Sequence, residues 1–220
     1  MSKPRRLLFD IGHPAHVHLF RNAMQRLMGN GHEIVIAIRD KDIVADLLDL
    51  YGFSYEKASV ARHGTLGLAV ELLEHDWHVM KLARRCRSEL LIGTSVSISH
   101  VARLIGARAI VFNEDDADAV RAFSLLAYPL ADAIVTPTCL EEYHGRRHVT
   151  YDSYQELAYL HPEVFTANPE ILTRLGVRHR EPYYVMRFVS LRAAHDRGEK
   201  GIGLATRRRL VETLSRHGKV

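Results

Sequence analysis

The chain has 220 residues, 47% hydrophobic and 25% charged, a composition typical of a globular protein with one large domain or somewhat more. No apolar run reaches the roughly 18 residues that a membrane-spanning helix needs, and the basic N-terminus lacks the apolar stretch of a secretion signal. The formal net charge is +4, but residues 172–220 alone sum to +8 and residues 1–171 to −4. The basic C-terminal segment indicates either an anionic partner or a solvated helix face.

Up to residue 136 the sequence alternates short apolar runs with amphipathic helical patterns. The apolar runs predict buried strands over 6–11, 33–38, 54–57, 90–92, 109–112 and 133–136. The patterns between them predict helices over 16–29, 42–51, 66–87, 97–105 and 119–130. Strands that are apolar throughout and alternate with helices indicate a parallel sheet covered on both faces, so we expect an α/β fold.

The pattern changes after Tyr151, where Pro162 and Pro169 interrupt the chain. We expect one or two short helices there, then a buried strand over 183–189 and a helix over 204–217. One strand and one helix cannot cover both faces of a parallel sheet. The sequence therefore predicts an N-terminal Rossmann-like domain (1–160), a connector (161–180) and an incomplete second Rossmann-like domain (181–220), as in a fragment of a longer protein.

The two cysteines, Cys86 and Cys139, are too few for a disulfide framework and do not have CxxC spacing. We therefore expect reduced thiols and a cytoplasmic protein.

Ligands of open α/β sheets bind at the carboxyl ends of the strands, so the residues that follow each predicted strand are candidate site residues. After the first strand, Gly12 permits a tight turn or a close backbone approach. His13 would lie at the start of the next helix, where backbone N–H groups favour a phosphate, and could act as a general base or phosphate contact. Helix capping by His13 and His16 is the alternative. His16 and His18 are two residues apart, which is poor spacing for a metal site on one helix face.

Polar residues also follow two later strands. Ser95 could contact a ligand or cap the next helix. Asn113 and Glu114 directly follow the strand over 109–112 and are the better site candidates. The acidic residues Asp116 and Asp118 could hold a cation beside a phosphate, but an acidic first helical turn explains them as well. The sequence has no GxGxxG after the first strand, no Walker A motif and no zinc-ligand spacing.

Several segments together resemble a known family. They are FDIGHPAHVH (9–18), GHE (31–33), AIRDK (37–41), YGF (51–53), VFN (111–113), YDSYQELAYLHP (151–162) and RFVS (187–190). Over essentially its whole length, the chain resembles the domain-of-unknown-function 354 family, found largely in archaea and in some bacteria. Members of that family look like GT-B glycosyltransferases and are similar to the lipid II N-acetylglucosaminyl transferase and to non-hydrolysing UDP-N-acetylglucosamine 2-epimerases.

The resemblance implies two Rossmann-like domains that face each other across a cleft. Gly12 and His13 would lie near the diphosphate of a nucleotide sugar, such as a UDP-sugar, and the acceptor would be a membrane lipid or a glycan. Arg187 and Ser190, at the tip of the first strand of the second domain, would face the same diphosphate. No metal or cofactor is required, because an arginine and helix N-termini can stabilise the leaving group.

The main hypothesis is therefore an enzyme of glycosyl transfer or sugar-nucleotide epimerisation. His13 or Glu114 would be the base, and His16, Ser95 and Asn113 would contact the substrate. We expect the 220-residue chain to be inactive by itself, because most of the second domain is missing. The alternatives are a non-catalytic scaffold or oligomerisation domain, and a nucleic-acid-binding module that uses the basic C-terminal segment. No helix-turn-helix, RRM or zinc-finger pattern supports the last of these.

Overall fold

The computed structural model describes residues 3–60, 65–178, 180–188 and 201–220. The chain divides into two compact units, Met1–Phe165 and Thr166–Val220. The predicted limits of 1–160, 161–180 and 181–220 remain a prediction.

The first unit is built on a seven-stranded sheet in the order β3-β2-β1-β4-β5-β6-β7, and every neighbouring pair is parallel. Its strands are β1 (Arg6–Ile11), β2 (Glu33–Asp40), β3 (Glu56–Val60), β4 (Leu90–Gly93), β5 (Arg108–Phe112), β6 (Ala133–Pro137) and β7 (His148–Tyr151). Strands β2 and β3 are added on one side of β1, whereas β4 and the strands that follow it are added on the other side. The neighbouring strands β1 and β4 therefore form the topological switch point of the sheet.

The connecting segments are mostly helical. The α-helices of the first unit are α1 (Pro14–Gly29), α2 (Val44–Leu50), α3 (Thr65–Arg85), α4 (Val96–Ile105), α5 (Arg121–Ala127) and α6 (Leu157–Leu160). Short 3-10 helices are η1 (Tyr128–Leu130), η2 (Thr138–Leu140) and η3 (Gly145–Arg147). The helix predicted over 119–130 is thus divided into α5 and η1, and η1 contains Pro129, whose ring lacks the N–H that a longer α-helix needs.

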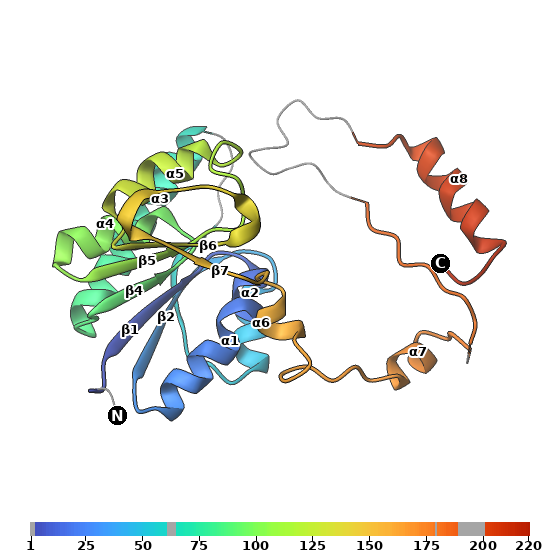
Figure 1. Cartoon of the computed structure of the whole chain (residues 1–220), viewed down its shortest axis with the longest axis horizontal. Helices are drawn as coiled ribbons and strands as arrows, with labels where there is room; N and C mark the ends of the chain where they lie inside the picture. The colour runs from blue at the N-terminus through green and yellow to red at the C-terminus, as the bar shows by residue number, and fades with distance from the viewer. Residues whose placement is uncertain (1–2, 61–64, 179, 189–200) are drawn as a thin grey trace. The chain divides into compact units, whose positions relative to one another are not determined.

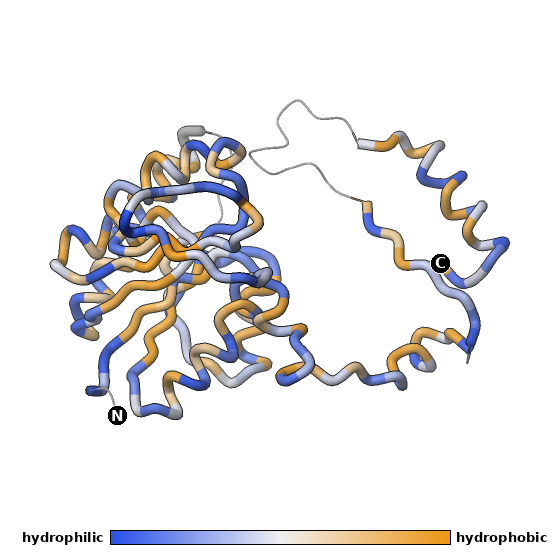
Figure 2. The backbone as a smooth tube through the Cα atoms, viewed as in Figure 1, coloured by the Kyte–Doolittle hydropathy of each residue, from blue (hydrophilic) through white to orange (hydrophobic). Residues whose placement is uncertain are grey.

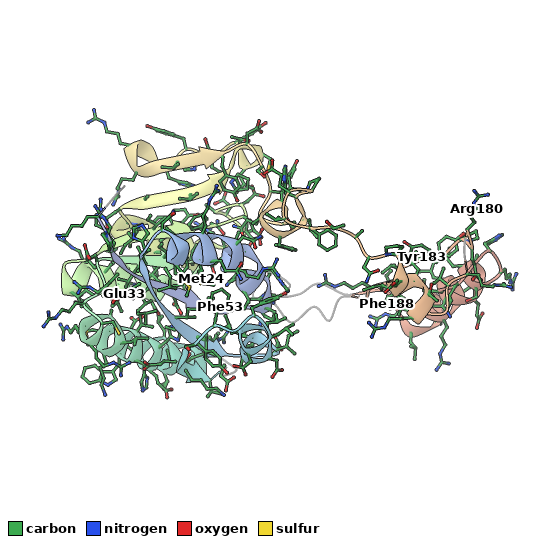
Figure 3. The ribbon with its side chains drawn as sticks, turned by 90° about the horizontal axis from the view of Figure 1, so that it is seen from below. Met24, Glu33, Phe53, Arg180, Tyr183 and Phe188 are labelled. Atoms are coloured by element: carbon green, nitrogen blue, oxygen red, sulfur yellow. The ribbon has the colours of Figure 1, made fainter. Side chains whose placement is uncertain are left out.

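The helices lie on both faces of the sheet and bury two apolar layers (Figures 1 and 2). Leu7, Phe9 and Ile11 of β1 pack with Phe20 and Met24 of α1 on one face. Leu8 faces the opposite layer, formed with α3 and α4. Phe53, which follows α2, belongs to the same layer as Met24, and both are labelled in Figure 3. Because strand side chains alternate, Asp10 faces the α3 side with Leu8.

Six of the strands agree with the sequence prediction to within three residues at each end, and β7 was not predicted. The segment of β7 reads His-Val-Thr-Tyr, and its only aliphatic side chain, Val149, is 52% exposed. β7 lies at the edge of the sheet and pairs with β6 alone. An edge strand that buries so little leaves no apolar run in the sequence.

The second unit contains α7 (Glu170–Arg174) and α8 (Leu204–Ser215). The prediction of a buried strand over 183–189 is wrong for the residues that the structure describes. Tyr183 makes one parallel bridge with Lys219, and Val185 is 87% exposed. Apart from the hydrogen bonds with Lys219, the described residues of this segment have no ladder of backbone partners that would make it a strand. Tyr183 and Phe188 are labelled in Figure 3, and the guanidinium of Arg207 lies 5.2 Å from the centre of the Phe188 ring.

Candidate functional site

The candidate site lies at the carboxyl ends of β1, β4 and β5. β1 pairs with β4 through Asp10 and Gly93, and β4 pairs with β5 through Gly93 and Val111. The loops that follow these strands therefore lie next to one another at the switch point, where open α/β sheets bind ligands.

His13 is the N-cap of α1. Its Nδ1 accepts a hydrogen bond from the backbone N–H of Ala15 at 3.2 Å, and Pro14 occupies the first turn. Partial burial, together with the charge of Lys41, lowers the pKa of His13. The ring is therefore neutral near pH 7. Because Nδ1 is an acceptor, Nε2 carries the proton and is available as a donor.

His16 lies one turn further along α1 and faces the β4 loop. Its Nδ1 is 2.8 Å from the hydroxyl of Thr94. Burial and the neighbouring His13 lower the pKa of His16 to about 4, so this side chain is uncharged at neutral pH. The rings of His13 and His16 are 5.7 Å apart.

A buried polar network, absent from the sequence prediction, lies directly beneath these loops. His75 of α3 places Nε2 2.9 Å from a carboxylate oxygen of Asp10 and Nδ1 2.7 Å from the hydroxyl of Ser59. Ser95 donates its hydroxyl to the same carboxylate. Asp10, Ser59 and His75 are 1%, 5% and 6% exposed. The network thus connects the ends of β1, β3 and β4.

The charges in this network stabilise each other. Burial by itself would raise the pKa of Asp10, but the charge and hydrogen bond of His75 and the hydroxyl of Ser95 outweigh it, so the pKa is lowered. Burial would lower the pKa of His75, but Asp10 raises it above its usual value. The one signal in the sequence was a carboxylate inside the apolar run RLLFDI.

Asn113 and Glu114 form the turn after β5. The side-chain amide of Asn113 donates to the Asp115 carbonyl at 2.6 Å and to the Tyr128 hydroxyl at 2.8 Å. Both hydrogen bonds stabilise the turn. Glu114 is exposed beside it. Loss of hydration and the negative charges of Glu156 and Asp115 raise the pKa of Glu114.

These loops surround a small cleft of about 170 Å³. Its lining residues are His16, Thr94, Phe112, Asn113, Glu114, Asp115, Val120, Phe123 and Gln155. A wider depression of about 680 Å³ lies at the opposite, amino-terminal edge of the sheet, lined by Arg6, Glu33 and Arg87 among others. We assign the site to the smaller cleft, because it lies at the carboxyl ends of the strands.

Neither the backbone conformation nor the packing at position 12 requires a glycine. Its backbone is not left-handed, and a Cβ at this position would meet no atom within 4 Å. The open space beside Gly12 is therefore free for a ligand rather than filled by the protein.

Of the predicted site residues in the first unit, Gly12, His13 and Ser95 lie in these loops but do not line the cleft itself. Arg187 is exposed in the second unit, and Ser190 lies outside the described residues. Among the residues that the structure describes, no group of three or more His, Cys, Asp or Glu side chains is arranged to hold a metal ion. None of the described helices is long and apolar enough to cross a membrane.

Solved structures with a similar fold were found by comparison. MurG of Acinetobacter baumannii has a TM-score of 0.57 at 13% identity, over 69% of this chain and 46% of its own. The Staphylococcus aureus MnaA–UDP structure gives 0.59 at 10% identity, over 81% and 52%. The Neisseria meningitidis UDP-GlcNAc 2-epimerase bound to UDP-GlcNAc gives 0.60 at 9% identity, over 80% and 55%.

The chain thus spans about half the length of these structures. At such low identity the likeness shows the fold alone, which is the Rossmann-like α/β fold of GT-B proteins, as predicted. A comparison with curated protein sequences found no significant match. The family model described as a protein of unknown function (DUF354) matches residues 6–214, and the chain therefore belongs to the DUF354 family.

Proposed function

We propose that the carboxyl edge of the sheet binds a nucleotide sugar and that the protein carries out glycosyl transfer or sugar-nucleotide epimerisation. The observation that carries this proposal is the convergence of the β1, β4 and β5 loops on one cleft at the switch point. Two structures of similar fold hold UDP or UDP-GlcNAc, which supports a uridine nucleotide as the donor class.

His13 and Gly12 suit a diphosphate. The Nε2–H of a neutral His13 can donate to a phosphate oxygen, and the open space at Gly12 lets that group approach the start of α1. The same protonation pattern makes His13 a poor base, since its free nitrogen already carries the proton. Arg187 and Ser190 of the second unit remain proposed diphosphate contacts, because a guanidinium has a fixed fork of donors.

Glu114 is the better candidate for the base. Its raised pKa makes the carboxylate a stronger proton acceptor than an ordinary surface glutamate. Ser95 has a different role from a diphosphate contact. Its hydroxyl hydrogen is directed to Asp10, so toward a ligand this side chain would act as a hydrogen-bond acceptor. His16, which is neutral and bonded to Thr94, orients that side chain.

Isothermal titration of the 220-residue chain with UDP and UDP-GlcNAc tests the proposal. We expect at least weak, saturable binding, together with a rise in melting temperature, because a ligand that binds only the folded state stabilises it. Absence of binding by both nucleotides at millimolar concentration would contradict the proposal. Binding that falls steeply with salt and is matched by unrelated polyanions would favour a non-specific basic surface instead.

A further inference from the structure

The segment AIRDK (37–41), one of the family-like segments, ends in three charged residues that the site described so far does not use. The first two have partners in the protein. Arg39 Nη2 donates to a carboxylate oxygen of the buried Glu71 at 2.9 Å. Lys57 Nζ donates to a carboxylate oxygen of Asp40 at 2.8 Å. These interactions hold the end of β2 to α3 and to β3, so neither charge is available to a ligand.

Lys41, the third charged residue, is bound much less firmly. Its Nζ lies 3.7 Å from Oδ2 of the neighbouring Asp42, an ion pair without a hydrogen bond. Among the described residues this is its one ion-pair partner, and the two side chains are 36% and 57% exposed. Such an exposed pair contributes little to stability, because water solvates both charges. The ammonium can therefore turn to an incoming anion at little cost.

The register of the sheet places Lys41 beside the loop that carries Gly12 and His13. Ile11, the last residue of β1, pairs with Ile38 of β2. β2 continues for two more residues and thus extends past the start of the β1 loop, and Lys41 follows it directly. Parallel neighbours end at the same edge of the sheet, so the two loops lie side by side there.

The titration of two histidines agrees with this placement. The positive charge of Lys41 lowers the pKa values of both His13 and His16, because a nearby cation disfavours a second positive charge. Asp42 acts on His13 in the opposite direction. The ammonium is therefore close to the start of α1.

The carboxyl edge of the sheet is divided by charge. Lys41 makes the β1–β2 side positive, whereas Glu114, Asp115 and Glu156 make the β5 side negative, which contributes to the raised pKa of Glu114. A phosphate is favoured on the first side and repelled on the second. His13 is neutral near pH 7, so it can donate a hydrogen bond to a phosphate but cannot neutralise its charge. A lysine ammonium supplies that charge.

We propose that Lys41 binds the diphosphate of the ligand, together with the Nε2–H of His13, in the open space beside Gly12. The ammonium neutralises part of the phosphate charge, and the histidine fixes one oxygen. This subsite lies beside the small cleft rather than in it, so the uncharged part of the ligand extends toward β5. The inference rests on the proposed function, since it names a residue that holds the diphosphate of that ligand.

Isothermal titration with UDP and with inorganic pyrophosphate tests the role of Lys41. Lys41→Gln removes the charge, so we expect the affinity for both probes to fall about tenfold, whereas Lys41→Arg keeps the charge and should lose about threefold or less. Lys81→Gln is the matched control, because Lys81 is an exposed lysine of α3 beside the start of β3, toward the opposite edge of the sheet. It should bind both probes as the unmodified chain does. The melting temperature of Lys41→Gln should stay unchanged, since only an exposed ion pair is lost.

The inference and the proposed function fail in different ways. A Lys41→Gln chain that binds UDP as the unmodified chain does would overturn the inference and leave the proposed function intact. Equal losses in Lys41→Gln and Lys81→Gln would also overturn it, because they would reflect net charge alone. Binding of pyrophosphate but not of UDP, lost in Lys41→Gln, would reject the nucleotide and keep the phosphate subsite. Absence of binding by both probes would reject both proposals.

The pKa of His13 gives a second test that needs no ligand. Lys41→Gln removes a positive charge beside the ring, so the pKa of His13 should rise, whereas Lys81→Gln should leave it unchanged. An NMR pH titration of the histidine ring signals measures this value, and His13→Gln identifies the signal. An unchanged pKa in Lys41→Gln would place the ammonium away from His13 and overturn the inference.

Discussion

Asp10 is an acidic side chain inside an apolar strand, and its position determines how three loops are held. A buried carboxylate is tolerated when it is paired and hydrogen-bonded. His75 and Ser95 supply both interactions, and Ser59 occupies the other nitrogen of the imidazole. The strand ends that lead into the loops of His13 and Thr94 are therefore joined by a charged, hydrogen-bonded pair in addition to the apolar packing around them.

The pair predicts a defined pH range of stability. The raised pKa of His75 contributes stability below about 6.5 that is lost as pH rises through the folded value. The lowered pKa of Asp10 contributes stability above about 3.9 that is lost as pH falls through the folded value. The contribution is therefore greatest between these limits. The charges of Asp76, Glu71 and His16 also act on the pair.

Urea unfolding of His75→Gln measures this contribution. We expect the variant to lose about 1–3 kcal/mol at pH 5–6, because Asp10 remains buried without its charged partner. The loss should shrink as pH rises above neutrality, since the unmodified chain then loses the same charge. His78→Gln, an exposed position on the same helix, is the control and should change stability little at any pH. A deficit that is independent of pH would mean that His75 acts only through packing.

Gly12 gives a second prediction about a single residue. Its Cβ would meet no protein atom within 4 Å, so Gly12→Ala should leave the free energy of unfolding unchanged within about 0.5 kcal/mol. UDP affinity should fall about tenfold, because the methyl group enters the space assigned to the diphosphate. Gly29→Ala is matched in that its Cβ also meets no atom within 4 Å, and it should bind UDP normally. Equal UDP affinity of both variants would place the diphosphate elsewhere.

At the scale of the elements, Gly93 shows how closely β1 and β4 approach. A Cβ at Gly93 would lie 2.6 Å from the carbonyl oxygen of Asp10, which is backbone and cannot rotate away. Gly93→Ala should therefore destabilise the fold by about 1–3 kcal/mol by forcing the two strands apart. Thermal unfolding measures the loss, and the Gly29→Ala chain serves again as the reference. A variant as stable as this reference would mean that the strands can separate at no cost.

The predictable part of the fold is the part whose side chains are buried. β1 could be located from RLLFDI because five of its six residues are buried, and the helix that follows it could be located from its apolar face. β7 has few buried side chains and was missed. The run YYVMRFV has the same composition as a core strand, yet strand formation needs neighbours, and residues 185–188 have none among the described residues.

The site could be predicted only where it follows a strand directly. His13, His16, Ser95, Asn113 and Glu114 were found in this way, because the ends of parallel strands share one edge. His75 lies in the middle of a long helix, and Gln155 follows a strand that the sequence did not reveal. Their proximity to the site comes from tertiary packing, which a single sequence does not display. The motif 151–162 was visible as a family-like segment, and the structure brings one of its residues, Gln155, to the lining of the cleft.

At the scale of the whole molecule, the two units differ in how their backbone is held, and hydrogen exchange should show it. Amides of residues 34–38 lie in β2, which pairs with β1 and β3, and Ile36 and Ile38 are buried. Residues 185–188 have no such ladder among the described residues, and Val185 is 87% exposed. We expect their amides to exchange about a thousandfold faster or more than those of β2, since exchange of β2 requires opening of the core. Tyr184 is an internal control, because its N–H donates to the carbonyl of Lys219 at 2.7 Å and should be protected to an intermediate degree. Protection of residues 185–188 equal to that of β2 would mean that this segment is a paired strand in solution, and the exposed bridge at Tyr183 would then be the start of a second sheet.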